Sequence, residues 1–517
     1  MRLLPTPRQL GFPAKYDGGW RPKQEEALHL LLSSQKRTSV LSMPTGSGKS
    51  AVVVAYALIT KRPTAIVTDS RQLQDQYLDD FKGVGMVDLR GRRNYSCPLK
   101  NDYTCEEGRV ARCPYHGQIA CPLSQAEFRA GTSSLVITNY DKWTSARKFG
   151  TGLSHIQQVV FDEGHKAPSA LERAMQVTLS ANEVERVLGI DFPSGVEELV
   201  NWKLWAMSAR REAEERMLAA KALLGANPSP SQVRLYTHLR NLCRRLNTIA
   251  TSNPNNWVVD QTERGFVFDV VQAGRYAEST LLLKVPRIVV VSATIRPKSL
   301  FLIGIAQKDF DYKEFDSDFD PKRAPIYYIP TMRVDKNAHD LSPLWTTMDR
   351  IAARRRDRKG LVQTISYLRQ GAATAFSQFA NAMILNPKGE PSTETLSLFR
   401  ASDPGAILVS PSFAEGVDFS GRDCEWQFVC KIPFPDSRSK VIRARQEADP
   451  EYGPYHAMNK LVQIFGRGMR YAKDQCENFI GDMHMDWFYP KYRHLAPKSF
   501  HGFYRQVTTL PAPPPKL

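Results

Sequence analysis

The 517-residue sequence lacks long apolar runs and is poor in cysteine. Its longest apolar stretches, such as 51–59, have about nine residues, roughly half of the 18–20 needed to span a bilayer. The opening residues, Met1-Arg-Leu-Leu-Pro-Thr-Pro, lack the apolar core of a secretory signal. Eight cysteines in this length exclude a disulfide scaffold. These absences predict a cytosolic protein with no membrane partner.

Acidic residues are also in deficit. The chain has 53 Asp and Glu against 70 Lys and Arg, a formal net charge of +17. Such an excess favours a polyanionic partner, nucleic acid above all, although solubility alone is the alternative. The apolar content of 42% is that of a folded globular protein, and a prior of about 150 residues per domain suggests roughly three domains.

Short apolar runs alternate with helical stretches in two successive sets. This alternation is typical of doubly wound α/β lobes, whose strands are covered on both faces. The first set of expected strands is 38–43, 65–68, 134–138, 158–161 and 287–292, and the second is 360–364, 382–385, 406–410, 427–432 and 478–480.

Two insertions interrupt the first lobe: a cysteine-bearing segment at 83–130 and a helical segment at 168–283. Within the second, apolar spacing predicts helices over 201–224 and 233–250. The expected domains are therefore lobe 1 at 1–82, 131–167 and 284–325, the two insertions, lobe 2 at 326–510, and a proline-rich tail at 511–517 that is disordered or extended.

A glycine loop follows the expected strand 38–43 and precedes an expected helix at 51–60. Its sequence places Gly46 and Gly48 where backbone N–H groups can face phosphate oxygens at a helix N-terminus. Lys49 would reach the β- and γ-phosphates, and the Ser50 hydroxyl would ligate Mg²⁺. Met43 stands where the strict pattern has glycine, and a chance glycine turn is the alternative.

Two adjacent carboxylates, Asp162 and Glu163, follow the apolar strand 158–161. The first can hold Mg²⁺ and the second can polarise an attacking water, the two roles that phosphoryl transfer to water requires. Alone, the pair is equally typical of a solvated strand end. Together with the Lys49 loop, it indicates nucleotide hydrolysis.

A polar stripe lies late in the second lobe. Gln463, Arg467 and Arg470 share one face if 455–471 is a helix. A solvated stripe is the alternative to an arginine finger, which stabilises the charge of a transferring phosphoryl group. A further basic run, Arg354-Arg-Arg-Asp-Arg-Lys359, is a weaker candidate for nucleic-acid contact.

These residues together resemble helicase superfamily 2. Arg21-Pro-Lys-Gln24 resembles its Q motif for adenine recognition, and Thr68 with Leu73 and Gln76 resembles motif Ia beside the DNA track. The segments that resemble motifs I, II, III, V and VI, in order, are Met43-Pro-Thr-Gly-Ser-Gly-Lys-Ser50, Asp162-Glu-Gly-His165, Ser292-Ala-Thr294, Glu415-Gly-Val-Asp418 and Gln463-Ile-Phe-Gly-Arg467-Gly-Met-Arg470.

The segment Gly91-Arg-Arg-Asn-Tyr-Ser-Cys97 resembles the entry to the iron–sulfur domain of the XPD/DinG helicases, and Thr138-Asn-Tyr140 fits the same branch. Four thiolates suit a 4Fe-4S cluster, whereas their spacing differs from the paired spacing of zinc ribbons. A zinc site including His116 and unligated thiols are the alternatives. The candidate ligands are Cys97, Cys105, Cys113 and Cys121.

The resemblance implies two tandem RecA-like lobes, with an iron–sulfur insertion and a helical arch insertion in the first lobe. It departs from the family in its short chain, its small arch and Asp482-Met-His484, where Asp-x-Arg is usual. The residues expected to act in catalysis are Lys49, Asp162, Glu163, Gln463, Arg467 and Arg470. ATP and Mg²⁺ would also be bound by Arg21, Gln24, Thr45, Gly46, Ser47, Gly48, Ser50, Gly416 and Asp418, and coupling would involve His165, Thr294 and Glu415.

The implied function is a monomeric DNA helicase that uses ATP and Mg²⁺, moves 5′→3′ on single-stranded DNA and unwinds forked duplex. The cluster would be structural. A DNA-stimulated translocase without unwinding, a nucleoprotein assembly subunit and an RNA track are the alternatives.

Overall fold

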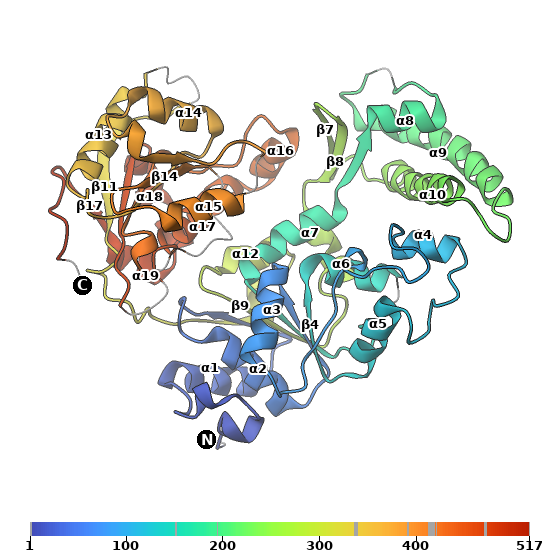
Figure 1. Ribbon diagram of the computed structural model, residues 1–517, viewed down its shortest axis with the longest axis horizontal. Coiled ribbons are helices and arrows are strands. Elements are labelled where there is room, and N and C mark those ends of the chain that lie inside the picture. Colours follow the sequence, from blue (N-terminus) through green and yellow to red (C-terminus); the bar gives the residue numbers. More distant parts are fainter. Residues whose placement is uncertain are drawn as a thin grey trace.

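A computed structural model gives the structure of residues 3–149, 152–193, 195–335, 340–389, 392–411, 419, 421–469 and 473–515. Two α/β lobes lie side by side, and an arch stands on the side of lobe 1 away from the bulk of lobe 2 (Figure 1). The cysteine segment lies between the arch and lobe 1. Among the helices that the structure describes, none combines the length and apolar character that a membrane crossing requires.

Lobe 1 is built on a parallel sheet with strand order β10-β1-β9-β5-β2-β4-β3. The five runs expected as strands all form strands, because each is apolar enough to be buried on both faces. Its strands are β1 (Thr38–Ser42), β2 (Thr64–Thr68), β3 (Val87–Asp88), β4 (Leu135–Asn139), β5 (Gln158–Asp162), β9 (Arg287–Ser292) and β10 (Phe310–Glu314).

Helices cover both faces of this sheet. In α2, every side chain from Ala51 to Ala57 is buried, so this helix forms the centre of one of the two cores around the sheet. The helices of lobe 1 are α1 (Pro22–Ser33), α2 (Lys49–Thr60), α3 (Arg71–Asp80), α6 (Tyr140–Phe149) and α12 (Pro297–Leu302).

The cysteine segment contains two short helices, α4 (Cys105–Val110) and α5 (Pro122–Thr132). A reciprocal cap formed by Thr104 and Glu107 starts α4. The short strand β3, although it lies within 83–130, pairs with β4 and extends the lobe 1 sheet. The segment is therefore joined to lobe 1 through a shared sheet edge.

The arch contains a small sheet besides its helices, which the sequence analysis did not predict. Its two long helices are as expected, but an antiparallel sheet of order β6-β8-β7 joins them to lobe 1. Alternating burial in β7 is typical of a sheet with one wet face. The elements are α7 (Ala167–Met175), β6 (Val177–Ser180), α8 (Ala181–Leu188), α9 (Leu199–Ala222), α10 (Pro230–Ala250), β7 (Trp257–Thr262), β8 (Gly265–Val270) and α11 (Ala277–Thr280).

Lobe 2 repeats the parallel architecture, with strand order β13-β14-β12-β15-β16-β11-β17. The prediction of two tandem α/β lobes is confirmed. Its strands are β11 (Ile326–Met332), β12 (Gly360–Gln363), β13 (Met383–Leu385), β14 (Ile407–Ser410), β15 (Trp426–Val429), β16 (Glu477–Asp482) and β17 (Tyr504–Gln506). Its helices are α13 (Ser342–Ala353), α14 (Tyr367–Phe376), α15 (Ser392–Ala401), α16 (Lys440–Ala448), α17 (Tyr452–Phe465), α18 (Met485–Tyr492) and α19 (Lys498–Phe503).

In the basic run at 354–359, Arg355, Arg358 and Lys359 are buried whereas Arg354 and Arg356 are exposed, which corrects the interpretation of the three buried residues as nucleic-acid contacts. Arg355 is 1% exposed and forms a two-pronged ion pair with Glu477, with both N···O distances at 2.7 Å. Arg355 and Arg358 also donate to carbonyl groups of Pro511 and Pro514. The run therefore holds the extended C-terminal tail on lobe 2.

Candidate functional site

The glycine loop lies between β1 and α2, as predicted. Gly46 and Gly48 have φ of 77° and 79°, a backbone region that glycine adopts without strain. A Cβ at Gly48 would lie 2.1 Å from the side-chain nitrogen of Gln24, so the Gln24 amide would have to move for a larger residue. The loop holds the N-terminus of α2 open toward a space where phosphate groups can bind.

Two residues of the predicted Q motif contact this loop. Gln24 donates to the Ser47 carbonyl at 3.3 Å, and the Arg21 guanidinium donates to the Gly46 carbonyl at 3.0 Å. The Gln24 side chain also accepts from the Arg21 backbone at 3.0 Å. The start of α1 therefore braces the loop from outside.

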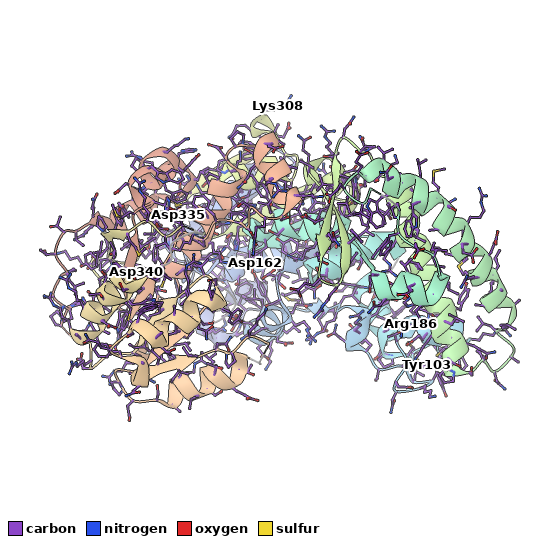
Figure 2. All side chains as sticks on the ribbon, turned by 90° about the horizontal axis from the view of Figure 1, so that it is seen from above. Tyr103, Asp162, Arg186, Lys308, Asp335 and Asp340 are labelled. Carbon is purple, nitrogen blue, oxygen red and sulfur yellow. The ribbon has the colours of Figure 1, made fainter. Side chains whose placement is uncertain are left out.

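The two carboxylates follow β5, the strand next but one to β1 in the sheet. Asp162 is buried, and Figure 2 places it near the middle of the molecule. Glu163 has φ of 49°, a strained backbone for this residue type that is common at functional sites. Burial and the neighbouring Glu163 raise the pKa of Asp162, while the charge of Lys49 opposes this shift. The lysine of the loop and the carboxylates therefore share one electrostatic environment.

A hydrogen-bonded link joins the two carboxylates to the end of β9. The Ser292 hydroxyl contacts His165 Nδ1 at 2.7 Å and Glu163 Oε2 at 3.3 Å, and it accepts from the Thr294 backbone at 3.2 Å. Burial raises the pKa of Glu163, but the hydrogen bond with His165 and the charge of Lys49 outweigh it and lower the pKa. The expected coupling residues His165 and Thr294 thus meet through Ser292.

One contact at this site has no sequence signal. The Tyr77 hydroxyl donates to Asp162 Oδ2 at 2.8 Å, from a helix that carries no recognised motif residue at that position. Tyr77 also contacts the Ser50 hydroxyl, and burial raises its pKa well above its usual value. Its phenol therefore stays neutral and ties the two predicted Mg²⁺ ligands together.

The predicted stripe on lobe 2 does not lie on one helix. Helix α17 ends at Phe465, with Gln463 in its last turn, and Arg467 lies in the turn that follows. The glycines at 466 and 468 explain the ending, because a Cβ at Gly468 would lie 2.4 Å from Cys476 Cβ. The remaining predicted site residues of lobe 2, Glu415, Gly416, Asp418 and Arg470, lie outside the described residues.

The cysteine segment brings the candidate ligands together. All four cysteines line one pocket, which His116 and Gly108 also line. A Cβ on Gly108 would lie 2.7 Å from Cys97 Sγ, so glycine is needed for the thiol to take this position. In the part of the chain that the structure describes, no three His, Cys, Asp or Glu side chains are grouped as ligands of a metal ion. The donor set and its shared pocket fit a multi-atom cluster held by thiolates.

A larger, basic cavity of about 670 Å³ lies where lobe 1 meets the cysteine segment. Its lining includes the start of α3, the residues before Cys97 and the start of α6. Arg71, which lines it, is held by Asn94 at 2.7 Å. The charged lining residues are Arg71, Arg92, Arg93, Asp141 and Lys142.

Comparison with known proteins shows which proteins this architecture resembles. No curated protein sequence gives a significant match. Residues 358–502 match the family described as Helicase C-terminal domain, and residues 17–190 match Type III restriction enzyme, res subunit. A solved XPD helicase covers 94% of this chain and 99% of its own length, at 14% identity and a TM-score of 0.66. The S. tokodaii protein Xpd4 covers 94% and 100%, at 13% identity and 0.62.

Residues 358–502 therefore match a helicase C-terminal domain, and the chain as a whole has the fold of the solved XPD helicases. The expected XPD-like fold, with two tandem α/β lobes, is therefore confirmed.

Proposed function

We propose that this helicase hydrolyses ATP to move 5′→3′ along single-stranded DNA and to unwind forked duplex. The observation that carries the proposal is the convergence of the Lys49 loop, the two carboxylates and the Ser292 link at one edge of lobe 1. A degenerate scaffold would have no use for this complete set. The polarity and the choice of DNA rest on the resemblance to XPD/DinG helicases.

ATP hydrolysis in this proposal uses the glycine loop and the two carboxylates. Lys49 binds the β- and γ-phosphates, and Glu163, kept ionised by its contacts, accepts a proton from the attacking water. When bound, Mg²⁺ would be held by Ser50 and Asp162 and would neutralise phosphate charge. Arg21 and Gln24 recognise adenine, and lobe 2 completes the γ-phosphate contacts through Gln463, Arg467 and Arg470.

The single strand in this proposal follows the basic cavity beside the cysteine segment. Arginine and lysine side chains there suit backbone phosphates of any sequence, so affinity should fall steeply with salt. The four cysteines would hold a 4Fe-4S cluster, which supplies a rigid cross-link for a segment with only two short helices. Protein purified without oxygen should contain iron and acid-labile sulfide at about four each per chain, whereas bound zinc would contradict the cluster.

Strand displacement from duplexes with either a 5′ or a 3′ single-stranded tail tests the proposal, with Lys49→Ala as the inactive control. We expect ATP-dependent displacement of the 5′-tailed duplex alone. Displacement from the 3′ tail would reverse the polarity. DNA-stimulated ATP hydrolysis without displacement would indicate a translocase, and neither activity would indicate an assembly subunit. If a matched RNA strand stimulated ATP hydrolysis more strongly than DNA, RNA would be the track.

A further inference from the structure

The short helix α16 of lobe 2 contacts the arch. This helix extends from lobe 2 toward β7 of the arch (Figure 1). Its own cap residue, Ser439, makes no side-chain cap, and the arch supplies one instead. The Asp260 carboxylate, on β7, accepts from the Lys440 backbone at 2.8 Å and from the Ser439 hydroxyl at 2.7 Å. An anion at a helix N-terminus satisfies free N–H groups and the helix dipole.

One turn further along α16, Arg445 is buried against the arch. Its guanidinium lies 3.0 Å from Glu172 on α7 and 3.5 Å from Asp269 on β8, and it donates to the Val270 carbonyl at 2.7 Å. The Tyr452 hydroxyl accepts from Arg445 at 3.1 Å. A buried arginine satisfied on several sides holds its neighbours in one arrangement.

These contacts begin close to the nucleotide site. Helix α7, which carries Glu172, follows directly after His165 and Lys166. Helix α12 begins at Pro297, three positions after Thr294. Lobe 2 also contacts two residues of α12. Lys298 pairs with Asp449 at 2.7 Å and Glu451 at 3.2 Å, and the Ser299 and Tyr455 hydroxyls lie 2.5 Å apart.

We infer that the segment 440–455 transmits nucleotide-dependent movement of the lobes to the arch, with Arg445 as the positioning residue. The segment contacts the helices that follow motifs II and III at one end and the arch sheet at the other. A shift of lobe 2 during ATP turnover therefore changes the position of the arch, and with it the contacts between the arch and the cysteine segment. This inference rests on the proposed helicase activity.

The number of ATP molecules hydrolysed per base pair separated tests this role, because a defect in coupling raises it and a simple loss of active protein does not. In Arg445→Gln we expect DNA-stimulated ATP turnover to stay within about twofold of wild type. Strand displacement should fall about 10-fold, an effect within the range measured for residues that carry coupling between sites. Arg443→Gln is the matched control, since this exposed arginine on the same helix bonds only to nearby carbonyls. Equal losses of both activities would overturn the inference.

A second variant guards against misfolding of Arg445→Gln. Asp260→Ala removes the cap on α16 from the arch side, where the carboxylate is only partly buried, and Glu263→Ala in the exposed β7–β8 turn is its control. Hydrogen exchange supplies a readout independent of unwinding. With ADP–beryllium fluoride, exchange in β7 and β8 should change in wild type and in Glu263→Ala, but not in Asp260→Ala.

The outcomes separate the two levels of the argument. A nucleotide analogue that changes exchange in the lobes of wild type but not in β7 and β8 would overturn the transmission and leave the helicase proposal standing. An analogue that changes hydrogen exchange in no part of the protein would contradict the proposed ATP site itself. An Asp260→Ala protein that responds like wild type would also overturn the transmission.

Discussion

The junction of the arch with the cysteine segment and its junction with lobe 2 differ in chemistry. Toward the cysteine segment, α10 presents arginines to carboxylates near α4: Arg234 lies 3.0 Å from Asp102, and Arg240 pairs with Glu106. Arg234 and Asp102 are 52% and 55% exposed. Toward lobe 2, the Arg445 side chain is 6% exposed and its partner Glu172 is 16% exposed. Figure 2 shows Tyr103 of the cysteine segment and Arg186 of the arch at the end of the molecule opposite lobe 2.

The difference teaches which junction can open. Exposed ion pairs contribute about 0–1 kcal/mol each and weaken with salt. Removing one partner of a buried pair costs about 3–5 kcal/mol, because the other charge stays buried alone. The arch is therefore fixed to lobe 2 and releasable from the cysteine segment, an arrangement that suits a passage for a single strand.

The largest effect is expected where the releasable junction is anchored, at the cysteines. Since loss of an outer partner of a metal site already costs about 10–100-fold in affinity or activity, Cys105→Ser should lower strand displacement at least about 10-fold. The lobes should still fold, because neither sheet includes this residue. Displacement rates and circular dichroism check the two halves. Cys243→Ser, a buried arch cysteine outside the pocket, is the control, and normal unwinding by Cys105→Ser would exclude a structural cluster.

Next comes the fixed junction. Arg445→Ala leaves Glu172 and Asp269 buried without their cation, and we expect the free energy of unfolding to fall by about 3 kcal/mol or more. Urea denaturation measures the loss. Arg443→Ala on the same helix should change it by no more than about 0.5 kcal/mol. A loss for Arg445→Ala no larger than for its control would erase the contrast between the junctions.

A smaller effect is expected at the releasable junction. Arg240→Ala should destabilise the protein by less than about 1 kcal/mol, since its pair with Glu106 is partly exposed. Hydrogen exchange of α4 should nevertheless rise, because this helix loses a restraint from α10. The contrast would be reversed by a loss of several kcal/mol.

Salt should give the smallest change. Raising ionic strength from 0.1 to 1 M shortens the screening length from about 10 Å to about 3 Å. Exchange at α4 should then increase slightly, while exchange at α16, whose Arg445 is buried in its ion pair with Glu172, should change less. Equal sensitivity of the two helices to salt would show that the junctions are alike.

Much of the fold could be predicted because its parallel strands are short, apolar and bounded by polar residues. The glycine loop and Asp162 could be predicted for a similar reason, since their chemistry depends on residue types at fixed local spacing. Tyr77 could not, because its contact with Asp162 joins residues 85 positions apart. The role of the arginine run at 354–359 could not be predicted for the same reason. Glu477, which pairs with Arg355, lies 122 positions away from it.

The helix through Gln463 shows a different failure. The spacing of Gln463, Arg467 and Arg470 predicted a helix beyond Phe465, but α17 ends there, before glycines 466 and 468. The arch sheet was missed because the long helices around it gave the stronger pattern. Strand β7 begins with three consecutive apolar residues, so its alternating burial is not visible in the sequence.

The order of strands in lobe 1 also bears on how the chain is made. Strand β9 lies between β1 and β5 at the centre of the sheet, yet it follows the whole arch in the sequence. During synthesis, β1 and β5 therefore wait without the strand that joins them until the arch has left the ribosome. Distant parallel pairing is slow, whereas continuous segments fold as units. The most peripheral part of the molecule is thus complete before its central sheet can close.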